Sequence, residues 1–132
     1  MSLGIYPVFN PKVPELVFDG GEALAAEFQV LDELADRYNL ARLTSFADTR
    51  VVPEGFDGPP EELEKVIGPW ADWFPCGDGR VAFERLATLI TDTPAAAMAL
   101  QAPDAVAADL RALMQALAVG EAHGAQFRLE MS

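Results

Sequence analysis

The chain has 132 residues, 51% of them hydrophobic, and 21 acidic residues against 9 basic ones give it a formal net charge of −12. This hydrophobic fraction predicts a packed core and excludes a disordered chain. One cysteine, Cys76, excludes an internal disulfide, and no apolar run approaches the roughly 20 residues that cross a bilayer. We therefore expect a single domain over residues 1–132, located in the cytoplasm. Its many alanines, and its preference for arginine over lysine, are typical of bacteria with GC-rich genomes.

The charge balance excludes two classes of partner. Nucleic-acid binding needs a surface of lysine and arginine that neutralises phosphates, and the few scattered basic residues do not supply one. The same negative field repels anionic lipid surfaces. It would attract a basic protein and speed their encounter, although acidity can also serve solubility alone. The sequence does not decide between a basic protein partner and solubility alone.

The first third of the chain predicts a strand followed by a long helix. Ile5 to Phe9 is typical of a strand, and Pro7 within it indicates an edge position or a bulge. After a turn at Gly20-Gly21, a helix is expected over residues 22–38. Its apolar residues fall at helical spacing on one face: Leu24, Phe28, Leu31, Ala35 and Tyr38.

The middle of the chain is less regular. Residues 43–46 are a candidate third strand, and 47–60 form an irregular stretch rich in proline and glycine. Pro60 is suited to the first position of a short helix, and Glu61 and Glu62 would stabilise its positive end.

The last part of the chain predicts three helices and a strand. Asp78 is a candidate N-cap for a helix with Phe83, Leu86 and Ile90 on its apolar side. Thr93-Pro94 opens a short alanine helix, and Pro103-Asp104 opens the final one. Residues 127–131 alternate between apolar and charged side chains, which predicts a half-buried strand. The expected fold is therefore α+β, with a small sheet of the N- and C-terminal strands covered by about four helices.

An aromatic segment is the most unusual local feature. Trp70, Trp73 and Phe74 lie between Pro69 and Pro75. On a helical turn the two tryptophans would share a face. This segment is either a plug of the core or an aromatic surface that anchors a partner, since tryptophan is enriched at binding hot spots.

Acidic and polar residues precede that segment. Asp57, Glu61, Glu62 and Glu64 form a candidate acidic rim, and Asp48 and Arg50 place polar groups in the irregular stretch. Their spacing does not match a calcium loop, so we expect no metal.

Two isolated residues, His123 and Cys76, are candidates for chemistry. His123, the one histidine, is expected at the end of the last helix, where a cation is favourable. Cys76 is either an apolar filler or a thiol made reactive by a helix N-terminus. Neither has an evident catalytic partner, and we expect no cofactor.

Three functional hypotheses follow. We favour a non-enzymatic protein-interaction module of a regulatory, adaptor or immunity-like kind, which would bind another protein, for instance a basic one. An alternative is a small-molecule-binding protein or small enzyme, with its site between the 47–60 loop and the 70–76 aromatic segment. A third is a homodimer that associates through a sheet edge or an apolar helix face.

Overall fold

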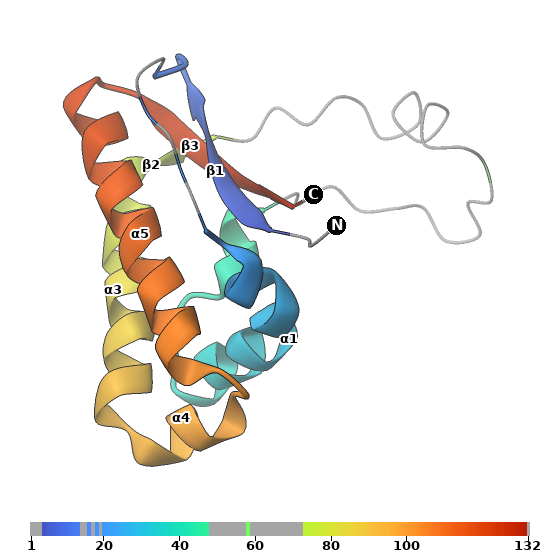
Figure 1. Ribbon diagram of the computed structural model, residues 1–132. Helices are drawn as coiled ribbons and strands as arrows, with labels where there is room; N and C mark the ends of the chain where they lie inside the picture. Colours follow the sequence, from blue (N-terminus) through green and yellow to red (C-terminus); the bar gives the residue numbers. More distant parts are fainter. Residues whose placement is uncertain are drawn as a thin grey trace.

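A computed structural model describes residues 4–13, 16, 18, 20–47, 58 and 73–131. The elements, in chain order, are β1 (Ile5–Asn10), α1 (Glu22–Arg37), the 3-10 helix η1 (Leu43–Phe46), β2 (Phe74–Pro75), α3 (Cys76–Asp92), α4 (Pro94–Ala99), α5 (Pro103–Ala122) and β3 (Gln126–Met131). Figure 1 shows the helices packed against one small sheet. The predicted α+β class is confirmed.

The sheet has the order β1-β3-β2, and both pairings are antiparallel. Ile5 lies opposite Met131, so the predicted pairing of the two terminal strands is confirmed. The third strand is Phe74–Pro75. Phe9 and Phe127 face each other on the inner side of the sheet, where both are buried.

Residues 43–46 were expected as a strand and form a 3-10 helix instead, so that prediction is wrong. In a 3-10 helix the side chains at i and i+3 eclipse each other. Leu43 and Phe46 are therefore both directed into the core, where they are buried. A strand would also have placed positions 43 and 46 on opposite faces. Short apolar runs do not distinguish these two outcomes by sequence.

The helices after β2 begin close to the predicted positions. α4 and α5 start at Pro94 and Pro103, as their proline signals indicated. α3 starts at Cys76, so Asp78 lies in its first turn and is not its N-cap. The predicted helix from Pro60 lies outside the described residues.

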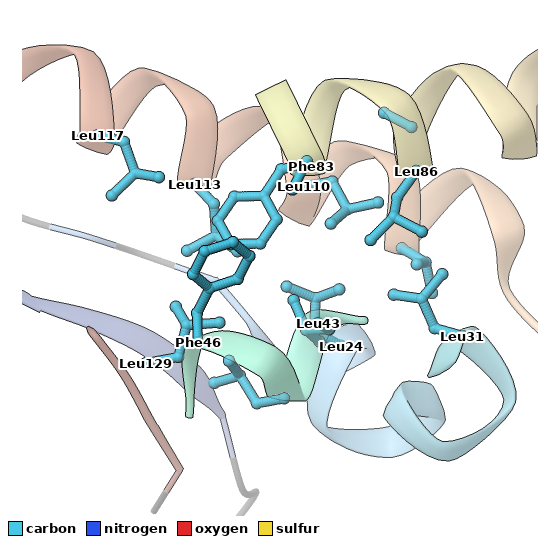
Figure 2. Packing of buried hydrophobic residues seen from close by; sticks show 14 of the residues in the cluster. Leu24, Leu31, Leu43, Phe46, Phe83, Leu86, Leu110, Leu113, Leu117 and Leu129 are labelled. Carbon is cyan, nitrogen blue, oxygen red and sulfur yellow. The ribbon is translucent and has the colours of Figure 1, made fainter. Parts of the chain in front are cut away.

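The core forms where α3 and α5, which lie side by side, meet α1 and the sheet (Figures 1 and 2). At its centre the ring of Phe46 lies 5.3–5.5 Å from three other rings, those of Phe74, Phe83 and Phe127. Gly120 of α5 allows the helix to approach the sheet closely, because a Cβ there would overlap the Phe9 ring. The core thus binds η1, the helices and the sheet into one unit.

Helices α1 and α5 cap each other. The N-cap residues of both, Gly21 and Ala102, have no side chain that could accept a hydrogen bond. The Asp109 carboxylate of α5 instead accepts from the N–H groups of Ala23 and Leu24, at 3.1 and 3.3 Å. The Glu27 carboxylate of α1 accepts from the N–H groups just before α5. Each helix therefore satisfies backbone donors at the start of the other or just before it.

Glu27 is the residue that makes the second of these caps. Its oxygens accept hydrogen bonds from Gln101 N at 2.5 Å and from Ala102 N at 3.0 Å. The backbone of α1 departs from helical angles at this residue, with φ −126° and ψ 15°. Glu27 is only 8% exposed, and the two N–H donors explain how a carboxylate can be buried there.

None of the helices in the described ranges is both long and apolar enough to cross a membrane.

Candidate functional site

The structure describes two of the predicted site residues, Trp73 and Phe74. The other six lie outside the described residues: Trp70, Asp48, Arg50, Asp57, Glu61 and Glu62. Glu64 of the predicted acidic rim lies outside them as well, as does most of the 47–60 loop that would line the alternative small-molecule site. The site must therefore be built around Trp73 and its described neighbours.

Phe74 points toward the core. Its ring contacts Phe46 edge-on at 5.4 Å and lies 6.3 Å from Phe127. Strand β2 is only two residues long, and Phe74 pairs there with Phe127 of β3. Phe74 is half-buried, and these contacts give it a packing role at the edge of the core.

Trp73, the preceding residue, contacts Arg128, whose side chain lies on the sheet face that is turned away from the core. Side chains alternate between the two faces along an extended chain, which explains why Trp73 and Phe74 diverge. The guanidinium carbon of Arg128 lies 4.4 Å from the centroid of the Trp73 ring, a cation–π contact. Trp73 is half-buried, and Trp70, the other tryptophan of the predicted aromatic segment, lies outside the described residues.

Arg128 links Trp73 to the next outward residue of β3. Its Nε lies 3.4 Å from Oε2 of Glu130, and the two side chains are 18% and 34% exposed. On β1, Val8 is paired with Arg128 and Tyr6 with Glu130. We call Tyr6, Val8, Trp73, Arg128 and Glu130 the outer sheet face, and all five are half-buried.

Sequence reasoning missed most of this face. The alternation in residues 127–131 places Arg128 and Glu130 outward, and the strand at 5–9 places Tyr6 and Val8 outward as well. These two alternation patterns are visible in the sequence. What the sequence did not contain was the pairing register, which brings Trp73 over Arg128.

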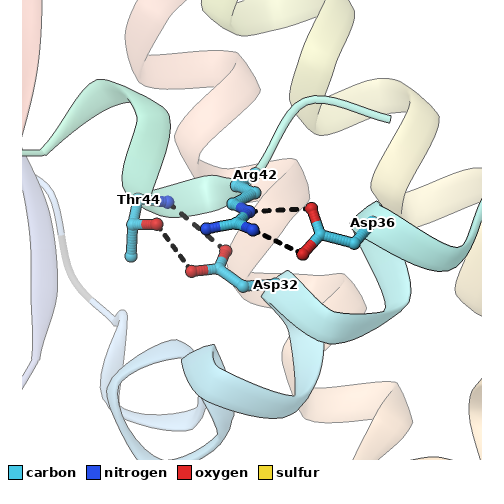
Figure 3. A network of polar contacts seen from close by, with 4 residues as sticks. All are labelled: Asp32, Asp36, Arg42 and Thr44. Carbon is cyan, nitrogen blue, oxygen red and sulfur yellow. Dashed lines mark hydrogen bonds and ion pairs between the residues drawn. The ribbon is translucent and has the colours of Figure 1, made fainter. Parts of the chain in front are cut away.

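A second polar cluster, between α1 and η1, is structural (Figure 3). Arg42 forms two hydrogen bonds to the Asp36 carboxylate, at 2.7 and 2.6 Å. The hydrogen bond from Arg42 lowers the pKa of Asp36, and the same hydrogen bond raises the pKa of Arg42. Asp32 accepts from the Thr44 hydroxyl at 2.6 Å and its N–H at 3.4 Å. These bonds fix η1 on α1 and so position Phe46.

Cys76 does not have the surroundings of a reactive thiol. It is 3% exposed, and its Sγ donates a hydrogen bond to the Ala125 carbonyl oxygen at 3.2 Å. Burial, and secondarily the Glu121 carboxylate, raises the pKa of the thiol, although Arg80 acts in the opposite direction. A raised pKa favours the protonated, non-nucleophilic form. These findings support the role of apolar filler.

His123 is the C-cap residue of α5 and is exposed, as expected for the end of the last helix. Within the described part of the chain, no three His, Cys, Asp or Glu side chains are grouped so that they could hold a metal ion.

Three comparisons with known proteins were made: with models of protein families, with curated proteins and with solved structures. None of them gives a match.

Proposed function

We propose that this chain is a non-enzymatic protein-interaction module that binds a basic protein partner. Trp73 on the outer sheet face would anchor the partner, and the net charge of −12 would speed its approach. The observation that carries the proposal is the position of Trp73. It is half-buried on the sheet face opposite to Phe74, beside a charged pair.

The neighbours of Trp73 support an anchoring role. Binding hot spots are enriched in tryptophan, tyrosine and arginine, and the contacts around them exclude water. The indole rests against the Arg128 guanidinium, and Arg128 is itself held by Glu130, so the ring is oriented before any partner arrives. An anchor that is already ordered loses less side-chain entropy on binding.

The edge of β1 is a poor surface for self-association, which favours a different protein over a second copy there. The Ile5 N–H donates to the Gly21 carbonyl oxygen at 3.0 Å. N–H groups of successive residues point to opposite strand edges, so the next donor position on the edge of Ile5 is residue 7, which is a proline and has no N–H. A second copy would find few donors to pair with on this edge.

The proposal is tested by affinity purification with the whole chain from its source organism, followed by measurement of the dissociation constant for the protein recovered. Trp73→Ala should weaken that binding by at least about tenfold, the loss expected of a hot-spot residue. The matched control is Tyr38→Ala, because Tyr38 is an exposed aromatic residue on the turn after α1 and away from the sheet.

Two further outcomes decide the parts of the proposal. Raising NaCl from 50 to 500 mM should slow association with the recovered protein, because salt screens charge steering. An association rate that does not change with salt would contradict the proposal that the partner is basic. Equal affinities of the Trp73→Ala and unmodified chains, both shown to be folded by circular dichroism, would contradict the anchoring role of Trp73.

A further inference from the structure

We draw no further inference here: the strongest candidate, the exposed face of α5 that carries Ala108, Gln115, Ala118, Val119 and Ala122, is a stripe of mostly small side chains, and nothing in the structure shows what covers it.

Discussion

Glu27 shows how a single polar residue can be essential to the packing of two helices. A lone buried carboxylate would be costly, because ionised groups lose their hydration in an apolar interior. Here the two N–H groups that precede α5 replace that hydration, and the positive end of the helix dipole adds to the attraction. The Glu27 carboxylate therefore holds α1 against the start of α5.

Replacing Glu27 by alanine should lower the free energy of unfolding by about 2–3 kcal/mol, because two hydrogen bonds to a charged group disappear and two donors lose their partner. Urea unfolding followed by circular dichroism measures this. Glu33→Ala is the matched control on an exposed site of α1 and should change stability by less than about 0.5 kcal/mol. Equal effects of the two variants would show that the Glu27 cap contributes little.

We expect the protein to lose stability at alkaline pH because of the buried thiol of Cys76. Its thiol pKa is raised in the folded protein, mainly by burial. The unfolded thiol ionises at about pH 8.5 while the folded one stays protonated, so the unfolded state then binds fewer protons. The stabilisation is present in full below that pH and is lost as the pH rises toward the folded-state value.

The experiment compares the unmodified chain with Cys76→Ala from pH 7 to pH 10. The free energy of unfolding of the unmodified chain minus that of Cys76→Ala should be constant up to about pH 8. Above that pH it should decrease, because only the unmodified chain loses the stabilisation that the thiol provides. A difference that grows with pH would show that the thiol is more acidic in the folded protein.

At the scale of elements, β1 is an edge strand whose sequence limits further pairing. Gly21, with φ +87°, brings the chain so close to the strand that a Cβ there would overlap the Ile5 carbonyl oxygen. This approach allows the hydrogen bond that occupies the Ile5 N–H, and Pro7 removes the next donor. Natural sheets use such devices to avoid edge-to-edge aggregation.

Pro7→Val should therefore increase self-association, because valine restores an N–H on the outer edge of β1. Light scattering at several concentrations should show an apparent mass that rises with concentration, while stability changes by less than about 1.5 kcal/mol. Val8→Thr is the control, because it changes a side chain of the same strand and adds no N–H to the outer edge. Equal apparent masses for all three proteins would mean that Pro7 does not protect the edge.

Element boundaries were predictable where a local signal marks them. Proline at the first helical position located the starts of α4 and α5, and alternation located β3. The helical face of α1 was predicted only in part, since Tyr38 is 38% exposed whereas Glu27 and Leu34 are buried. The backbone of α1 is kinked at Glu27, whose carboxylate accepts a hydrogen bond from the N–H of Gln101, two residues before α5.

At the scale of the whole molecule, the excess of negative charge opposes compaction. Twenty-one acidic residues against nine basic ones repel one another more strongly in the folded state, where they are closer together. Screening by salt weakens this repulsion over distances of about 10 Å at 0.1 M. The acidity that would steer a partner therefore also costs some stability.

Stability should accordingly rise with salt. Between 20 and 300 mM NaCl we expect the free energy of unfolding to increase by roughly 1 kcal/mol, the size of one or two surface charge interactions. Urea titrations at both concentrations measure it. Glu33→Gln combined with Asp92→Asn removes two exposed charges and should reduce the increase. A fall in stability with salt would indicate that attractive ion pairs dominate.

The sequence by itself determined the class of the fold, the pairing partners at the two ends of the chain and the excess of negative charge, because periodicity, capping residues and composition are local properties. Only the tertiary structure decided that residues 43–46 form a 3-10 helix, that Glu27 and Asp109 cap each other's helices, and that Trp73 rests on Arg128. Those contacts join residues far apart in the chain, so their free energy depends on how the elements pack.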